Sequence, residues 1–217
     1  VRSLSGAHPQ ICSVRSLAKT AGGKEIWVIS IGSGNKESKP GIAVFGGIGG
    51  NHILGRELSM GFAASLRGEV SSPEIKELLD KITFYVFPDV SPDATEQFFS
   101  GLRYERKGNA RATDNDNDYT TDEDGYEDLN KDGLITLMRI KDPAGRFIKS
   151  DEDERIMDLA DISEGQSGNY LVFSEGIDND KDGNFNEDGP GGVDFNRNFT
   201  FNYESFGPGA GMYPVSE

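Results

Sequence analysis

The sequence predicts a layered α/β domain, in which helices cover both faces of a sheet. Three short apolar runs rich in β-branched residues, each bounded by Gly, Ser, Asn or Pro, indicate buried strands. Two helical patterns lie between the second and third runs, and this order of strand, helix, helix, strand is typical of an α/β domain. Strands that are apolar throughout indicate a sheet that is covered on both faces.

The three strands are expected at residues 25–32, 41–47 and 82–88. The first helix is expected at residues 54–66, because apolar side chains recur there at a spacing of four and therefore share one helical face. These side chains are Leu54, Leu58, Phe62 and Leu66. The second helix is expected at residues 73–80, where Ser72 is a candidate N-cap and Pro73 occupies the first helical position.

The acidic residues are concentrated in one segment of the chain. The 217 residues include 22 basic and 37 acidic ones, which gives a formal net charge of -15. Residues 114–188 hold 23 of the acidic residues and 7 of the basic ones, so the rest of the chain is nearly neutral. We therefore expect one domain over residues 1–217 that contains a loop-rich acidic insertion at residues 113–191. Two strands, at residues 134–140 and 170–174, are expected inside the insertion.

The charge pattern excludes several classes of partner. No basic patch is present to neutralise phosphates, so binding to nucleic acid or to an anionic membrane surface is not expected. No run of about 18 apolar residues occurs, so no membrane span is expected. Val1 is not followed by a charged and then apolar leader, so we expect a secretory signal to be absent or already removed. The single Cys12 excludes an internal disulfide and a cysteine zinc site.

Three stretches of the insertion have the spacing of calcium-binding loops. Oxygen-bearing side chains at alternate positions, followed by Gly, let a short loop surround a hard cation. None has the Glu of an EF-hand at position twelve, so an acid near position ten is the expected closing ligand. The predicted calcium ligands are Asp114, Asp116, Asp118, Glu123, Asp128, Asn130, Asp132, Asp178, Asp180, Asp182 and Glu187. The alternative is a set of solvated acidic turns, but so many carboxylates repel one another unless cations neutralise them.

Three further motifs occur in order along the chain: GGIGGNHILGRE at residues 46–57, SPDA at residues 91–94 and VDFNRNF at residues 193–199. Together they resemble the zinc carboxypeptidases of the carboxypeptidase A type, and the acidic loops resemble an insertion of large bacterial members. The resemblance covers essentially the whole chain. It implies a three-layer α/β/α sandwich with a mixed sheet, which we expect to be incomplete here.

In that family a His-x-x-Glu pair and a distant His hold zinc, and a separate Glu acts as general base. Gly49 stands in place of the first His and His52 in place of the Glu, so His52 is expected to be only a remnant of the zinc site. His8, the other histidine, is expected to be a surface residue. The third ligand and the base would lie beyond Glu217, because the final YPVSE resembles a segment upstream of both.

The resemblance also implies a binding site for the substrate carboxylate. Asn196 and Arg197 match the pair that grips the C-terminus of a peptide, where a guanidinium fork suits a carboxylate. Arg111 is the expected counterpart of the arginine that stabilises the oxyanion, with Arg103 and Arg106 as nearby alternatives. An ion pair between Arg197 and the acidic loops is the structural alternative to a binding role.

Three functions are open at this point. The first is a relative of the zinc carboxypeptidases that binds peptide or protein C-termini without cleaving them. The second is a fragment of an active, zinc-dependent carboxypeptidase, and the third is a calcium-stabilised extracellular interaction module. Half a sandwich would leave a sheet edge and apolar faces uncovered, so we expect self-association or association with a missing C-terminal portion. The calcium loops and the resemblance imply a secreted, periplasmic or extracellular location.

Overall fold

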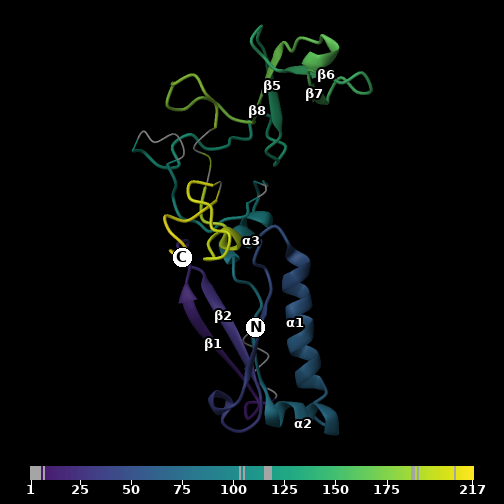
Figure 1. The fold of residues 1–217 in the computed structure, drawn as a ribbon, viewed down its shortest axis with the longest axis vertical. Helices are drawn as coiled ribbons and strands as arrows, with labels where there is room; N and C mark the ends of the chain where they lie inside the picture. The colour runs from purple at the N-terminus through teal and green to yellow at the C-terminus, as the bar shows by residue number, and fades with distance from the viewer. Residues whose placement is uncertain are drawn as a thin grey trace. The chain divides into compact units, whose positions relative to one another are not determined.

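The structure is a computed structural model that describes residues 6, 8–102, 104, 106–114, 119–186, 189, 191–207 and 209–217 (Figure 1). The chain forms two compact units. The first, here called the core unit, comprises Val1–Ser100, Tyr104–Ala112 and Gly191–Glu217. The second, here called the acidic unit, comprises Gly101–Arg103 and Thr113–Pro190. Each unit contains a four-stranded sheet of its own.

The sheet of the core unit is mixed. Its strands are β1 (Cys12–Lys19), β2 (Glu25–Ile31), β3 (Gly41–Phe45) and β4 (Thr83–Phe87), in the order β1-β2-β4-β3. β3 and β4 are parallel, and the other two pairs are antiparallel. The predicted α/β class with a mixed sheet is confirmed, and the three predicted strands are present with bounds that differ by at most two residues. The sequence analysis missed β1, whose apolar residues are interrupted by Arg15 and by serines.

Three α-helices belong to the core unit: α1 (Ile53–Gly68), α2 (Pro73–Lys81) and α3 (Pro92–Phe98). In Figure 1, α1 runs alongside the sheet and α2 crosses its lower end. Both helices contribute to one buried apolar cluster with alternate residues of the strands. The cluster contains Cys12, Ile29, Ile31, Ala63, Leu66, Leu79, Phe84 and Val86. Short 3-10 helices lie at η2 (Lys36–Ser38) and η4 (Phe195–Arg197).

The face of α1 that meets the core differs from the predicted one. Leu66 is 6% exposed, but Leu54 and Leu58 are 71% and 64% exposed. The buried positions are instead Ser59, Ala63 and Leu66. Spacing identified an apolar face, but only its C-terminal end packs on the sheet, because no described residue lies over the N-terminal half of that face.

The face of the sheet opposite α1 and α2 carries a second set of apolar side chains. Val86 points into the buried cluster, so Phe87 and its parallel neighbour Phe45 point to the other side, where their rings stack 4.8 Å apart. They line an open hollow of about 480 Å³ together with Phe195 and Phe199. Among the described residues, the core unit therefore shows a sheet with one helical layer and one apolar face that is largely open.

The acidic unit is built on an antiparallel sheet. Its strands are β5 (Leu137–Lys141), β6 (Phe147–Lys149), β7 (Met157–Leu159) and β8 (Tyr170–Ser174), in the order β5-β8-β6-β7. β8 has the predicted bounds, whereas the strand expected at residues 134–140 begins three residues later. A 3-10 helix, η3 (Ile162–Glu164), follows β7. In the part of the chain that the structure describes, no helix is long and apolar enough to cross a membrane.

Two leucines test the packing of α1. We expect Leu66→Ala to lower the free energy of unfolding by about 2–4 kcal/mol, because it opens a cavity in the buried cluster. Leu159→Ala makes the same change at an exposed position of β7 and should cost less than about 0.5 kcal/mol. Urea unfolding of both variants measures the difference. Equal losses would show that the described packing of α1 is wrong.

Candidate functional site

A buried carboxylate fixes the turn after β4. Asp93, at the start of α3, is 6% exposed and accepts three hydrogen bonds from two separate segments. The donors are the Thr20 hydroxyl at 2.6 Å, the Gly22 N–H at 3.2 Å and the Ala110 N–H at 2.8 Å. These bonds replace the water that the carboxylate loses on burial. Asp93 therefore fixes the position of the segment that carries Arg111.

Asn109 joins this segment to the one that precedes the Asn-Arg motif. Its side chain is 1% exposed, and its Oδ1 accepts hydrogen bonds from the N–H groups of Val193 at 2.9 Å and Arg111 at 3.2 Å. The backbone N–H of Asn109 donates to the Val193 carbonyl at 3.0 Å. Arg106 reinforces the junction, because its Nη2 donates to the carbonyls of Asn109 and Gly191.

The guanidinium of Arg111 pairs with an acidic side chain of the core unit. Arg111 Nη1 binds Glu217 Oε1, and Asn109 Nδ2 donates to Glu217 Oε2 at 3.1 Å. The Arg111 side chain is about half exposed, whereas the side chain of Glu217 is mostly buried. Arg106 differs from Arg111 in that its guanidinium donates to backbone carbonyls. Arg103, the other alternative, lies outside the described residues.

Asn196 and Arg197 lie in η4, which Asp194 caps. The Asp194 carboxylate accepts a hydrogen bond from the Asn196 N–H at 2.9 Å, and the Arg197 N–H donates to the Asp194 carbonyl at 2.8 Å. The side chains of Asn196 and Arg197 are exposed and line a polar hollow of about 270 Å³ whose wall includes Phe201 and Glu204. Within the described ranges, no carboxylate forms an ion pair with Arg197.

The turn between β3 and α1 does not fit a zinc ion. Gly49 has no ligand atom, and a Cβ built on it would lie 2.9 Å from His52 Cδ2. Side chains at positions 49 and 52 therefore point to the same place, where a metal-binding pair would need them. Of positions 49 and 52, only His52 offers a ligand atom, and among the described residues its exposed imidazole belongs to no group of three acidic, His or Cys side chains that could share an ion. A Cβ at Gly50 would lie 2.0 Å from Ala94 Cβ, which fixes the turn against α3.

Two of the predicted calcium loops, residues 128–136 and 178–186, share a pattern of hydrogen bonds over their first seven residues. In each, the first Asp accepts a hydrogen bond from the N–H of the sixth residue, at 2.8 Å in the first loop and 3.1 Å in the second. In each, the third and fifth side chains accept from the N–H groups two residues later. The fourth residues, Lys131 and Lys181, have φ values of 63° and 70°. The repeated geometry indicates one type of loop.

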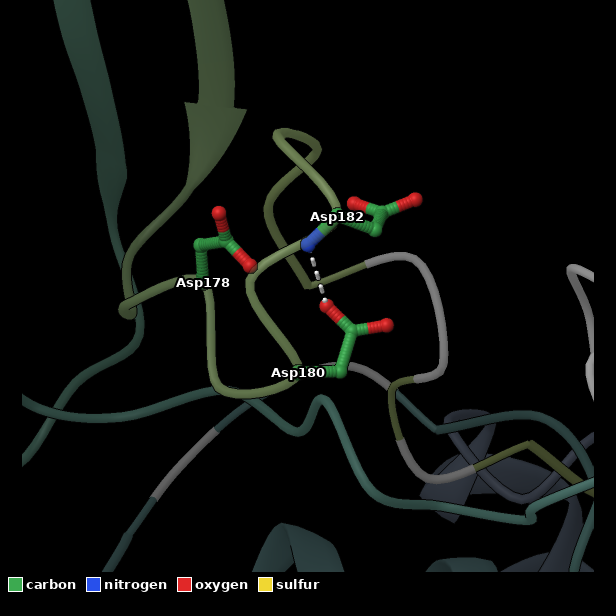
Figure 2. A group of neighbouring side chains, drawn as sticks. All are labelled: Asp178, Asp180 and Asp182. Carbon is green, nitrogen blue, oxygen red and sulfur yellow. Dashed lines mark hydrogen bonds between the residues drawn. The ribbon is translucent and has the colours of Figure 1, made fainter.

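Three carboxylates converge in the second loop (Figure 2). Oxygen atoms of Asp178, Asp180 and Asp182 lie within 4.8 Å of one another. The hydrogen bond from the Asp182 N–H lowers the pKa of Asp180, but desolvation and the two neighbouring carboxylates outweigh it, so the pKa is raised above its ordinary value. The loop therefore holds negative charges that oppose one another, and these oxygens could bind a cation.

Each loop is held by a buried carboxylate that precedes the other loop. Glu175 is 4% exposed and accepts from the N–H groups of the second, third and ninth residues of the 128–136 loop at 2.9, 3.1 and 3.1 Å. Asp124 is 1% exposed and accepts from the second and ninth N–H groups of the 178–186 loop. The Thr136 hydroxyl, with these N–H groups, lowers the pKa of Glu175. Ionised Glu175 therefore stabilises the fold at pH values above the pKa that it has in the unfolded chain. This contribution is lost as the pH falls through the lowered pKa of the folded state.

The remaining predicted ligands are only partly described. Asp114 accepts a hydrogen bond from the Tyr119 N–H at 3.0 Å, and Glu123 is partly buried. Asp116, Asp118 and Glu187 lie outside the described residues.

Four of the residues that organise the site have no role in the sequence analysis. Asp93 stands inside the SPDA motif and Asn109 lies two residues before Arg111, but their hydrogen bonds join segments that are far apart in the chain. Asp124 and Glu175 look like further acids of the insertion, and only burial distinguishes them from the exposed ones. A signal for Asn109 is its place in GNAR, since a Gly-Asn pair before an arginine is typical of a tight turn.

The geometry can now be compared with known proteins. The zinc carboxypeptidase family model matches residues 1–217, so the chain belongs to the zinc carboxypeptidase family. The chain is similar to carboxypeptidase M of Mus musculus, with 28% identity over 100 residues, and to carboxypeptidase D of Anas platyrhynchos, with 24% identity over 147 residues. These matches cover 44% and 66% of this chain, respectively.

Among solved structures, the chain is similar to a putative carboxypeptidase A from Shewanella denitrificans. The identity is 27% and the TM-score is 0.38, over 42% of this chain and 24% of that chain. The match spans 23% of the length of the mouse relative and 10% of the duck relative. The family implies zinc, although the turn described above lacks a ligand at position 49.

Proposed function

We propose that this protein binds peptide C-termini and does not hydrolyse them. The observation that carries the proposal is the turn at Gly49 and His52, which supplies one metal donor where the family uses two. Loss of both members of a ligand pair weakens a metal site far more than one replacement can restore. A catalytic zinc would polarise the scissile carbonyl and activate water, and neither task has a substitute among the described residues of this turn.

The arrangement of Asn196 and Arg197 supports the binding function. Both side chains are exposed on a capped 3-10 turn, and they line the same polar hollow. A guanidinium offers two parallel N–H donors to a carboxylate, and an amide beside it adds a donor or an acceptor for the last peptide group. Among the described residues of the core unit, no carboxylate forms an ion pair with Arg197.

A fragment of an active carboxypeptidase is the second candidate. It is favoured by the length comparison, because the match spans 23% of the mouse relative and 10% of the duck relative, so further residues could add ligands. Even with such residues, this turn would contribute only one metal ligand, His52. We therefore rank this candidate below a non-catalytic function.

We propose further that the acidic unit binds calcium. The two loops at residues 128–136 and 178–186 share their hydrogen bonds, and each presents three oxygen-bearing side chains at alternate positions. Hard oxygen ligands in this spacing suit calcium better than zinc. A calcium requirement would fit a secreted, periplasmic or extracellular location, where the ion is abundant. The acidic unit alone, as a calcium-stabilised interaction module, is the third candidate function.

We propose finally that the open edge of the core unit is covered by another polypeptide. β3 lies at the end of the strand order, with Ile42 and Phe45 exposed, and Leu54 and Leu58 are exposed on α1. Apolar side chains next to unpaired strand groups favour association. A C-terminal portion of a longer protein or a second copy could fill this role, and the chain by itself should use a second copy.

Arg197→Ala tests the binding of peptide ends. We expect the wild-type protein to bind an N-acetylated Gly-Phe dipeptide, and the variant to bind at least about ten-fold more weakly, because it loses charge-assisted hydrogen bonds to the carboxylate. Calorimetric titration measures the affinity, and Arg15→Ala removes the same charge from β1 as a control. Release of phenylalanine that a zinc chelator abolishes, with stoichiometric bound zinc, would support the active enzyme instead.

Calcium should raise the melting temperature of the protein by about 5 °C or more at saturating concentration, and a chelator should reverse the shift. Asp180→Asn should reduce the shift, whereas Asp158→Asn, at an exposed acid of β7, should leave it intact. The raised pKa of Asp180 means that protons compete with calcium, so the shift should shrink as the pH falls toward about 4. Identical melting curves with calcium and with chelator would contradict the proposal.

Sedimentation velocity tests the open edge. We expect the protein to form a dimer at micromolar concentration, and Leu58→Glu to shift it to a monomer, because a charge on the contact opposes burial. Leu129→Glu changes an exposed leucine of the acidic unit and should leave the dimer intact. A monodisperse wild-type monomer would show that no second copy covers this edge.

A further inference from the structure

The side chain of Glu217 is bound by two donors that come from one turn. Arg111 holds Oε1 through a charge-assisted hydrogen bond, and Asn109 Nδ2 donates to Oε2 at 3.1 Å. Both carboxylate oxygens are therefore occupied. The Glu217 side chain is 14% exposed, although the Arg111 side chain is 48% exposed. Glu217 thus covers part of a guanidinium that would otherwise face solvent.

The turn that holds Glu217 has the features of a carboxylate receptor. Asn109 is fixed because its Oδ1 accepts hydrogen bonds from two N–H groups. The N–H of the next residue, Ala110, donates to the Asp93 carboxylate at 2.8 Å. A guanidinium and an amide N–H are therefore presented together from a rigid backbone. Donors that are already oriented bind an anion without a further loss of conformational entropy.

The segment that carries Glu217 is held in a strained conformation. Val215, a β-branched residue, has a φ of 59°, in the left-handed region that such residues avoid. Its N–H donates to the Asn198 carbonyl at 2.6 Å. Strain of this kind persists only where surrounding contacts impose it, and it favours the release of the segment when those contacts are lost.

Apolar side chains next to Glu217 strengthen its ion pair with Arg111, but the pair stays partly exposed to water. Glu217 also borders the apolar hollow lined by Phe195, Phe199 and Val215, and apolar walls reduce the screening of a charge by water. The Arg111 side, however, remains half open to solvent. A half-exposed pair contributes modestly to stability, so a ligand carboxylate can compete with it.

We propose that Glu217 is an internal ligand that masks Arg111, and that it must leave before Arg111 can contact the carboxylate or the carbonyl of a bound peptide end. The proposal rests on the proposed function for the peptide, but the masking of Arg111 can be measured without any peptide. While Glu217 is bound to Arg111, Arg197 is the arginine that contacts the ligand first. Displacement of Glu217 then makes the positive charge of Arg111 accessible to the ligand.

Glu217→Gln keeps the size of the side chain and removes its charge. We expect the variant to bind an N-acetylated Gly-Phe dipeptide about five-fold more tightly than the wild type, because the fraction of molecules with an open Arg111 rises. The C-terminal amide of the same dipeptide should gain nothing. Glu37→Gln makes the same charge change at an exposed residue of η2 and should leave the affinity unchanged. The gain should vanish in the double variant Arg111→Ala, Glu217→Gln.

Chemical labelling separates this inference from the proposed function. Phenylglyoxal modifies accessible arginines, and mass spectrometry of the digested protein gives the rate at each site. We expect labelling of Arg111 to become several-fold faster in Glu217→Gln, while labelling of Arg15 stays constant. Faster labelling without any peptide binding would support the masking and refute the binding function.

An unchanged rate at Arg111 in a folded variant would overturn the masking, and so would a weaker affinity for the dipeptide in Glu217→Gln. Thermal melting establishes whether the variant is folded. If it is not, Glu217→Asp, whose side chain is shorter by one methylene, replaces it with the same expected increase in labelling.

Discussion

The buried carboxylate of Asp93 is the constraint on which the core unit's site depends. It receives hydrogen bonds from the loop between β1 and β2 and from Ala110, so three segments that are far apart in sequence meet at one residue. Removing it would deprive the N–H groups of Gly22 and Ala110 and the hydroxyl of Thr20 of their partner, which costs more than any one of the bonds contributes. Because Ala110 is fixed, Asn109 and Arg111 on either side of it are fixed too, and through Asn109 the segment before η4 is joined to them.

The described core unit lacks a ligand at position 49 of the family's zinc-binding turn but presents arginines that can bind a carboxylate. The backbone of the turn after β3 still directs positions 49 and 52 toward each other, but the side chains there are those of Gly and His. The arginines of the core unit are supported by buried polar residues, and one of them already holds a carboxylate, Glu217. Recognition of a peptide end depends on hydrogen-bond donors and not on a metal, so a fold that supports anion binding in this way does not need metal ligands for it.

Some features of the fold were predictable because they are local. The strands β2, β3, β4 and β8 are short apolar runs between turn residues, and α2 begins at a Ser-Pro pair. β1 was missed because its polar residues do not alternate cleanly. The spacing in α1 specified a helical face but not which of its side chains are buried, and Leu54 and Leu58 are exposed. The loops with alternate acids were predicted from spacing, and two of them share a pattern of hydrogen bonds. Their binding of calcium remains a prediction.

The sequence by itself determined the α/β class, the family, the position of the acidic insertion and the replacement at Gly49 and His52, because each depends on residue types at short spacing. The tertiary structure alone decided that Asp93 and Asn109 join distant segments, that Asp124 and Glu175 brace each other's loops, and that Glu217 occupies Arg111. These contacts join residues separated by 17 to 108 positions. No local pattern encodes such contacts, because whether an acidic residue is buried and hydrogen-bonded depends on residues that are distant in the sequence.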